Sequence, residues 1–329
     1  MRAVQIVSLD GPRAVALGAV PEPDAAAGHS LTPGEGVLIE VRAAGVSFPE
    51  VLQTRGQYQL KPDLPFVPGA EVAGVVRAAP AGSGLRPGDR VAAATVLGGF
   101  AELALAPAFL TFRLPDALDF AQGAGLVLNY HTAWFALRLR AGLRDGERVL
   151  VHGAGGGLGS AALQVAAGLG ARTVAVVSSD AKERVAREAG AEAVVRAGGP
   201  WREQVQELTG GGVDVVLDPV GGDRFLDSVR VLREGGRLVV LGFTGGAIPE
   251  IRVNRLLLRN VAVVGAFWGG YALGKPELNR QIGAAVDELI AAGAVRPLVG
   301  ARFGLDRAAE ALELIDGRGA TGKVVLDVT

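Results

Sequence analysis

The sequence predicts an α/β protein with two domains, one of which is built around a doubly wound parallel sheet. Its 329 residues are enough for about two domains. Hydrophobic residues make up 49% of the chain and charged residues 20%, a composition that supports a sizeable core. In the middle of the chain, six runs rich in Val and Leu alternate with helical patterns. Such alternation is typical of βαβ units that share a parallel sheet.

The elements follow from hydrophobic periodicity and from Gly and Pro at their ends. The first 120 or so residues read as short strands, for example 36–46 and 70–80, with few helical stretches. The six buried strands of the sheet are expected at 149–152, 173–177, 193–195, 214–217, 237–241 and 261–265. The helices between them are expected at 160–168, 180–189, 201–208 and 223–232. Beyond Gly269 we expect helices at 277–292 and 307–316 and a last strand at 323–328.

A glycine-rich turn, "LVHGAGGGLGSAALQVAAGLGA" at 150–171, follows the first of these strands. Glycine alone is weak support, because a chain with 49 Gly contains a three-glycine pattern by chance roughly once. The context is stronger, since the turn joins a strand to a helix, where a doubly wound fold binds a dinucleotide pyrophosphate. We therefore assign cofactor binding to Gly156, Gly157, Leu158 and Gly159, with Gly159 also allowing close helix packing. The alternative is a tight turn without a ligand.

The end of the second strand, "VAVVSSDAKER", indicates which nicotinamide cofactor is bound. An acidic residue at this place binds the ribose of NAD, whereas a nearby cation suits the phosphate of NADP. Ser178 and Ser179 stand at the strand end and Lys182 follows, so we predict NADPH, bound by these three side chains. Asp180 has the alternative role of a helix N-cap.

Composition argues against several other classes. The net charge is −1 with no basic tract, so no nucleic-acid partner is expected. No apolar run reaches about 18 residues and no signal peptide is recognisable, so we expect a cytoplasmic protein without a membrane span. The chain has no cysteine, and its three histidines are scattered, so no metal site is expected.

Several motifs in order resemble the zinc-independent quinone oxidoreductases of the medium-chain dehydrogenase/reductase superfamily. They include "AAGVSFPEVLQTRGQYQLKPDLPFVPGAEVAGVV" at 43–76, "RPGDRV", "DPVGGDRF", "VVGAFWG" and "ATGKVVL". The resemblance implies a GroES-like, mainly β catalytic domain at 1–123 and 267–329, and a Rossmann domain at 124–266. It further implies NADPH-dependent reduction of quinones or conjugated carbonyls without metal. Most such proteins are homodimers, here expected to pair through the strand near 261–265.

The resemblance also implies roles for individual site residues, and this chain differs from the family's usual residues at some of these positions. Zinc-dependent relatives have a cysteine ligand at the position of Ser47 and a histidine at that of Ala70. Many quinone oxidoreductases have Asn at the position of Ser47 and Asp at that of Glu50, so Ser47 is expected to act with a shorter reach. The resemblance implies that Thr132 contacts the nicotinamide side of the cofactor. Lys323 either approaches the cofactor or is an exposed lysine at the start of a strand.

The remaining candidates follow from the chemistry of hydride transfer and from the sheet. Tyr58 and Ser47 are our catalytic candidates, because a hydroxyl can hydrogen-bond a carbonyl oxygen on which negative charge develops. For Tyr58 the alternative is a loop residue with its hydroxyl in water. Ligands bind beyond the carboxyl ends of parallel strands, so Gly242, Phe243, Phe267 and Trp268 are expected to wall the nicotinamide. Their alternative is interdomain packing. For His131 we favour packing among aromatic residues over catalysis.

Two other functions stay open at this point. An enone or enoyl-thioester reductase would share these motifs, since it also adds hydride to a conjugated system. A non-catalytic NADPH-binding regulator could keep the fold without turnover. The sequence does not name the physiological acceptor.

Overall fold

The computed structural model describes residues 1–328 and divides into two compact units. The first unit comprises Met1–Leu128, Pro276–Gly283 and Val299–Thr329, and the second comprises Asn129–Lys275 and Ala284–Leu298. Each is described by itself below. Among residues 1–328, no helix is both long enough and apolar enough to cross a membrane.

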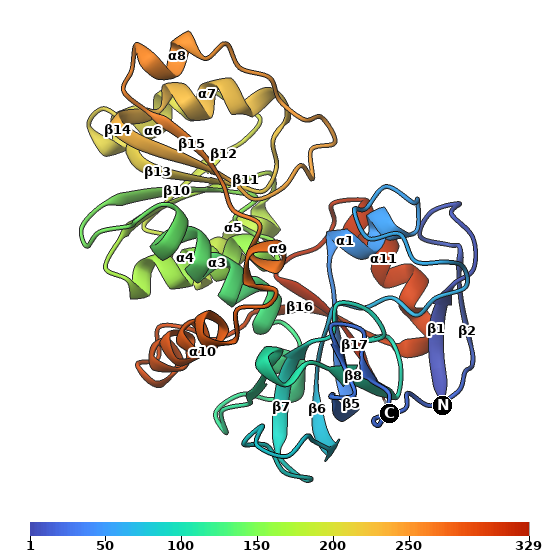
Figure 1. The fold of residues 1–329 in the computed structure, drawn as a ribbon. Coiled ribbons are helices and arrows are strands. Elements are labelled where there is room, and N and C mark those ends of the chain that lie inside the picture. Colours follow the sequence, from blue (N-terminus) through green and yellow to red (C-terminus); the bar gives the residue numbers. More distant parts are fainter. Residues whose placement is uncertain (329) are drawn as a thin grey trace. The chain divides into compact units, whose positions relative to one another are not determined.

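The second unit is built on a six-stranded sheet in the order β12-β11-β10-β13-β14-β15, with every pair parallel (Figure 1). The doubly wound parallel sheet predicted from the sequence is therefore confirmed. The strands are β10 (Arg148–His152), β11 (Arg172–Val177), β12 (Ala193–Arg196), β13 (Val213–Asp218), β14 (Leu232–Val240) and β15 (Ala262–Gly265). Their order reverses direction at β10, and a ligand-binding crevice forms at such a switch point in open α/β sheets.

Helices lie on both faces of this sheet (Figure 1). One face carries α4 (Gly157–Gly168) and α5 (Asp180–Glu188), and the other carries α6 (Trp201–Thr209) and α7 (Phe225–Arg230). Shorter pieces are η4 (Gly222–Arg224), α8 (Asn254–Leu257) and α9 (Trp268–Ala272). A buried core that includes Leu150, Val216 and Leu238 from the strands and Val205 and Val229 from the helices holds the layers together.

The predicted helix at 223–232 is wrong at its end. The helix α7 stops at Arg230, and β14 already begins at Leu232. Gly235 adopts φ +74° early in that strand, a conformation that glycine reaches without strain. The strand β14 therefore begins before 237–241, the Val- and Leu-rich run from which this strand was predicted.

A helical stretch before β10 was not predicted. It runs through η2 (Val127–His131), α3 (Thr132–Trp134) and η3 (Phe135–Arg140), of which η2 and η3 are π-helical. A π-helix bonds residue i to i+5 and is wider than an α-helix. The apolar residues of this stretch therefore do not recur with the 3.6-residue period used to recognise a helix.

The first unit is mainly β, as expected. Its largest sheet has seven strands in the order β16-β17-β5-β6-β7-β9, with β8 paired to β5. These are β5 (Val37–Val46), β6 (Glu71–Ala78), β7 (Arg90–Ala94), β8 (Leu103–Ala106), β9 (Thr111–Arg113), β16 (Val299–Gly304) and β17 (Lys323–Asp327). Two hairpins accompany it: β1 (Arg2–Ile6) with β2 (Val15–Ala19), and β3 (Gly28–His29) with β4 (Thr32–Pro33). The pairing of β17 with β5 joins the two ends of the chain in one sheet.

The remaining helices are short, except for α10 with its 16 residues. They are α1 (Phe48–Gln53), η1 (Ala108–Leu110), α2 (Phe120–Gly123), α10 (Pro276–Ala291), η5 (Leu305–Arg307) and α11 (Ala308–Asp316). The pair β5–α1 matters most for the site. Ser47 directly follows β5 and is the N-cap residue of α1, so the strand end and the helix start fix its position.

Candidate active site

The glycine turn joins β10 to α4 without any side chain at the helix cap. The N-cap residue of α4 is Gly156, with φ −94° and ψ 178°. The first N–H groups of a helix have no partner within the helix, and glycine has no side-chain oxygen to bind them. Such an N-terminus carries partial positive charge and binds anions such as phosphate. The turn therefore fits the pyrophosphate of a dinucleotide.

The glycines of this turn differ in what surrounds them. A Cβ added at Gly159 would lie 2.2 Å from the backbone oxygen of Gly153, so α4 approaches the turn as closely as glycine allows. A Cβ at Gly155 would lie 2.4 Å from Cβ of Lys182 on α5. Glycine at position 155 therefore gives α5 room to pack against the turn. At Gly156 the nearest atom to an added Cβ would be the Gly153 oxygen, at 3.5 Å, an ordinary van der Waals contact, so the protein itself leaves room for a side chain there.

The end of β11 brings Ser178, Ser179 and Lys182 together. Ser179 caps α5, and its hydroxyl accepts a hydrogen bond from the backbone N–H of Lys182 at 3.3 Å. Nζ of Lys182 donates to Oγ of Ser178, also at 3.3 Å. The alternative role of Asp180 as the N-cap is wrong, because Ser179 holds that position and Asp180 is the first residue of the helix.

Arg196 is a residue of this cluster that sequence reasoning missed. It ends β12, which pairs with β11 so that Arg196 stands beside Val177. Its guanidinium forms ion pairs with Asp180 and Glu183. The signal was a basic residue at the end of the third strand, because the ends of neighbouring parallel strands lie side by side. Arg196 thus neutralises the carboxylate of Asp180. It also adds a second cation, besides Lys182, at the ends of β11 and β12.

Other predicted cofactor residues follow β14 and β15. Gly242 and Phe243 are half-buried just beyond β14. Phe267 is 62% exposed, whereas Trp268 is buried and offers little surface to a ligand. The indole of Trp268 meets the ring of His131 edge-on, with centroids 5.6 Å apart. Burial lowers the pKa of His131 to about 3, so this imidazole is neutral near pH 7. Thr132 follows it, half-buried, at the start of α3.

In the first unit, Ser47 belongs to a buried charged network. Nζ of Lys323 donates to Oγ of Ser47 at 2.7 Å and forms an ion pair with Glu71. The other oxygen of Glu71 accepts from the backbone N–H of Leu128 at 3.0 Å. Glu50 accepts from the backbone N–H groups of Ser47, at 2.9 Å, and of Ala70, at 3.0 Å. Lys323 is only 3% exposed, so the alternative of an exposed lysine at a strand start is wrong.

Two groups near this network have shifted pKa values. Burial raises the pKa of Glu50 from 4.5 to about 7, a shift that the charge of Lys323 opposes and that of Glu71 adds to. Burial and the charge of Glu50 raise the pKa of Tyr58, whose side chain is half-buried. The Tyr58 phenol therefore keeps its proton and can donate a hydrogen bond.

The residues at the zinc-ligand positions do not fit a zinc ion. Ser47 and Ala70 offer neither thiolate nor imidazole, and the positive charge beside Ser47 comes from the ammonium of Lys323. Within residues 1–328, no three His, Asp or Glu side chains are grouped so that they could hold a metal. We derive no step through a metal.

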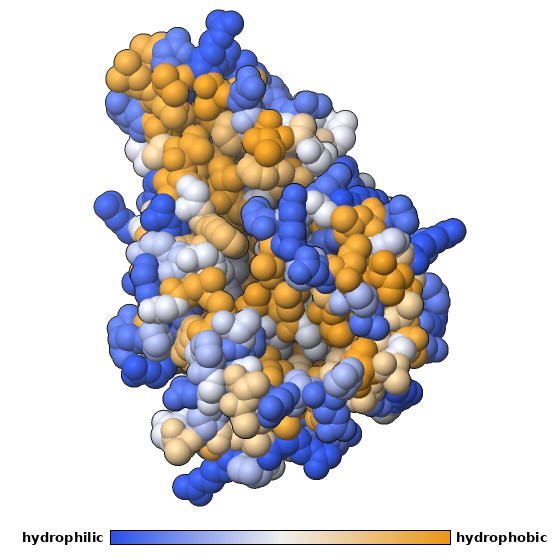
Figure 2. Space-filling model, turned by 45° about the vertical axis from the view of Figure 1, so that its right-hand side comes forward, coloured by the Kyte–Doolittle hydropathy of each residue, from blue (hydrophilic) through white to orange (hydrophobic). Residues whose placement is uncertain are grey.

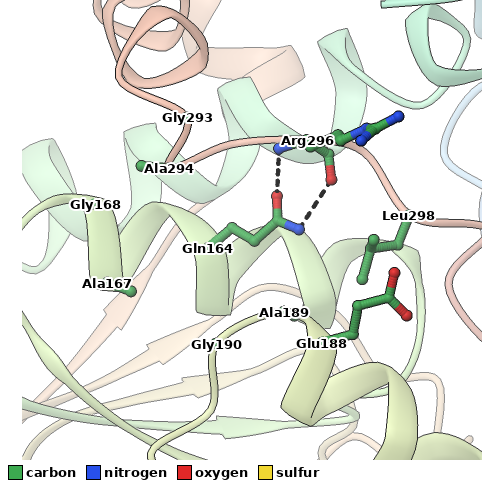
Figure 3. Close-up of a pocket in the computed structure, with 10 residues that line it drawn as sticks. All are labelled: Gln164, Ala167, Gly168, Glu188, Ala189, Gly190, Gly293, Ala294, Arg296 and Leu298. Atoms are coloured by element: carbon green, nitrogen blue, oxygen red, sulfur yellow. Dashed lines mark hydrogen bonds between the residues drawn. The ribbon is translucent and has the colours of Figure 1, made fainter.

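The structure also has a pocket of about 410 Å³ at the other end of α4 (Figure 3). None of the predicted site residues lines it. Its most buried polar side chain, Gln164, is hydrogen-bonded at both ends of its amide: Oε1 accepts from the Tyr130 hydroxyl and from N–H of Arg296, and Nε2 donates to the Arg296 oxygen. We attach no function to this pocket.

Comparisons with known proteins agree with this geometry. The family model described as "Alcohol dehydrogenase GroES-like domain" matches residues 33–116, and the one described as "Zinc-binding dehydrogenase" matches residues 157–285. The GroES-like fold predicted for the mainly β part is therefore confirmed.

Three relatives illustrate the similarity. The human protein named "Quinone oxidoreductase" is 34% identical over 99% of this chain and 97% of its own length. The "Quinone oxidoreductase-like protein 2" of Bos taurus is 37% identical over 89% of this chain and 85% of its own. The quinone oxidoreductase from Thermus thermophilus, whose structures include a complex with NADPH, is 34% identical with a TM-score of 0.82, over 99% of this chain and 100% of its own.

The family predicted from the motifs is thus confirmed by matches that span almost the whole chain. The family models place a GroES-like domain and a dehydrogenase domain in this chain, and the overall fold matches that of the Thermus thermophilus enzyme. The chain belongs to the quinone oxidoreductases of the medium-chain dehydrogenase/reductase superfamily, and it is an oxidoreductase.

Proposed function

We propose that this protein is an NADPH-dependent reductase that transfers hydride to quinones or related conjugated carbonyls without a metal. The observation that carries the proposal is the uncapped glycine turn at the N-terminus of α4, beside the hydroxyls and cations at the end of β11. The NADPH complex of the Thermus thermophilus relative supports the choice of cofactor. When bound, the cofactor supplies the hydride.

The second unit holds the residues that we propose for cofactor binding. The backbone from Gly156 to Gly159, including Gly157 and Leu158, would bind the pyrophosphate. Ser178, Ser179 and Lys182 would bind the 2′-phosphate, and we add Arg196 to this group. Thr132, Gly242, Phe243, Phe267 and Trp268 would line the nicotinamide. Lys323 was also predicted to approach the cofactor, and a different role for it is argued below.

Two hydroxyls of the first unit are proposed to act on the substrate. Ser47 and Tyr58 would donate hydrogen bonds to its carbonyl oxygen, which gains negative charge as hydride is added. Both hydroxyls are protonated near pH 7, and the raised pKa of Tyr58 keeps it so in more alkaline solution. These donors would replace the Lewis acid of a zinc enzyme.

A panel of acceptors tests the reaction. NADPH oxidation would be followed with a benzoquinone, a simple enone and an enoyl-CoA as acceptors. We expect the quinone to give the highest kcat/KM. A clear preference for the enone or the enoyl-CoA would support the alternative reductase. Tight NADPH binding without turnover of any acceptor would favour a non-catalytic regulator.

We also propose that the protein is a cytoplasmic homodimer with domains at 1–123 plus 267–329 and at 124–266. The strand β15 is at the edge of its sheet, where unpaired backbone groups can bond a second copy. Apolar side chains are exposed between β14 and β15, namely Ile248, Val253, Leu257 and Leu258. Figure 2 shows apolar atoms gathered at its upper end, where Figure 1 labels α8.

Sedimentation at equilibrium would test the dimer. We expect twice the mass of 33.6 kDa for the wild type and a monomer for Leu258→Asp, because a buried, unpaired carboxylate opposes association. A wild type that sediments as a monomer would contradict this proposal.

A further inference from the structure

The charged network of the first unit is buried except at one residue, Ser47. We use the name Ser47 network for Ser47, Glu50, Glu71 and Lys323. Glu50 and Glu71 are 1% exposed and Lys323 is 3% exposed, whereas Ser47 is only half-buried. Any molecule that reaches the network from solvent therefore meets Ser47 first. Its interaction with the buried charges behind Ser47 passes through that residue.

The direction of each hydrogen bond in the network is fixed by chemistry. An ammonium only donates and a carboxylate only accepts, so Lys323 is the donor toward both Glu71 and Ser47. Oγ of Ser47 is consequently an acceptor in its bond with Lys323. Its own proton remains to be donated, and within residues 1–328 no acceptor for it is found.

The carboxylates do not compete for that proton. Both oxygens of Glu50 accept backbone N–H groups, from Ser47 and Ala70. Glu71 accepts from Lys323 with one oxygen and from Leu128 with the other. Each carboxylate oxygen of the network thus has another donor, and none accepts from the Ser47 hydroxyl, whose proton is left for a ligand.

We propose that Lys323 acts on the reaction through Ser47: its ammonium, bonded to Glu71, polarises the Ser47 hydroxyl so that this hydroxyl donates a stronger hydrogen bond to the substrate's carbonyl oxygen. The inference rests on the proposed reductase function. Ser47 is the catalytic residue, because it touches the substrate, and Lys323 is a positioning residue. Hydrogen bonds in a chain strengthen one another, and a cation at one end favours negative charge at the other. This role differs from the cofactor contact predicted for Lys323.

A double-mutant cycle distinguishes this role from a merely structural ion pair. Ser47→Ala should lower kcat for a benzoquinone about 100-fold, as the loss of one oxyanion donor does in other enzymes. Lys323→Met should lower kcat about 10-fold in the wild type but less than about 2-fold in the Ser47→Ala background. Ser47→Thr, which keeps the hydroxyl, should retain most of the activity. Equal losses from Lys323→Met in both backgrounds would overturn the inference.

Removing only Lys323 leaves Glu71 as a buried charge without its cation, which could prevent folding. The pair Glu71→Gln with Lys323→Met removes both charges, and it replaces the single variant in both backgrounds if Lys323→Met does not fold. We then expect the charge-free pair to lower kcat much less in the Ser47→Ala background than in the wild type. Equal losses of kcat in the two backgrounds would overturn the inference.

A binding measurement separates this inference from its alternatives. The dissociation constant of NADPH, measured by its own fluorescence, should change less than about 2-fold in Lys323→Met or in the charge-free pair. Weaker NADPH binding would instead support a cofactor contact and overturn the inference. If the wild type binds NADPH but reduces no acceptor of the panel, the proposed function and the inference both fail. If the wild type reduces an acceptor, but Lys323→Met lowers kcat equally in the wild type and in Ser47→Ala, only the inference fails.

Discussion

Glu50 should make the stability of the first unit depend on pH. Its carboxyl is buried beside Glu71 and Lys323, and its pKa in the folded protein is about 7, compared with 4.5 for the free side chain. The protonated form is therefore favoured by folding. Its contribution to stability is complete below the unfolded pKa, near 4.5, and is lost as the pH rises through about 7.

The size of the effect follows from the shift. One pKa unit corresponds to about 1.4 kcal/mol, so the shift of Glu50 corresponds to a loss of about 3 kcal/mol between about pH 4.5 and about pH 8. The matched control is Glu50→Gln, which does not titrate. Gln, like the protonated carboxyl of Glu50, offers one good acceptor oxygen, so the variant resembles the low-pH form of the wild type and its stability lacks the Glu50 part of the pH dependence.

The probe must report on the first unit. All three tryptophans, Trp134, Trp201 and Trp268, belong to the second unit, so their fluorescence does not report on the first. Hydrogen exchange of the β6 amides (Glu71–Ala78) gives the opening free energy of the core strand that begins beside Ala70. The other titrating groups are the same in the wild type and in Glu50→Gln, so their contributions to the pH dependence cancel in the comparison. A difference between wild type and Glu50→Gln that is the same at about pH 5 and about pH 8 would refute the reasoning.

Three further predictions concern the cofactor and the substrate. Lys182→Ala should lower kcat/KM for NADPH about 10-fold, with little effect on kcat/KM for NADH. Arg184→Ala, an exposed control on the same helix, should change neither value. Equal losses for both cofactors would contradict the 2′-phosphate role of Lys182. Gly159→Ala should lower the Tm by several degrees, because its Cβ would lie 2.2 Å from the Gly153 oxygen, whereas Gly156→Ala should fold normally and bind NADPH more weakly. Tyr58→Phe should lower kcat about 10-fold at unchanged Tm, and an unchanged kcat would remove the phenol from the reaction.

The sheet could be predicted from the sequence because a buried parallel strand must be apolar on both faces. The runs at β10, β11 and β13 therefore stood out in a single sequence. The glycine turn was recognisable for a related reason, since only glycine permits the approach of α4 at Gly159. In both cases the physical requirement falls on residues that are adjacent along the chain.

The Ser47 network could not be predicted in the same way. Ser47 and Lys323 are 276 positions apart, and their contact depends on the pairing of β17 with β5. Nothing local in "ATGKVVL" indicates that the lysine is buried against Glu71. The π-helical stretch before β10 was missed because its apolar residues follow a wider helix than the one the periodicity assumes.

Arg196 lies between these two cases. Its place at the end of β12 was visible, but its ion pair with Asp180 depends on the pairing of β12 with β11. Strand order in a doubly wound sheet can be inferred once the fold is recognised. A search of neighbouring strand ends for basic residues would therefore have found it.

The central proposal for this chain is that it reduces quinones with NADPH and without a metal. The most direct measurement is the oxidation of NADPH, followed by its absorbance, when a benzoquinone is added to enzyme dialysed against a strong chelator. We predict turnover that the chelator does not diminish, with a kcat/KM for NADPH at least about 10-fold above that for NADH. Activity that disappears on chelation and returns with zinc, or a preference for NADH, would contradict this proposal.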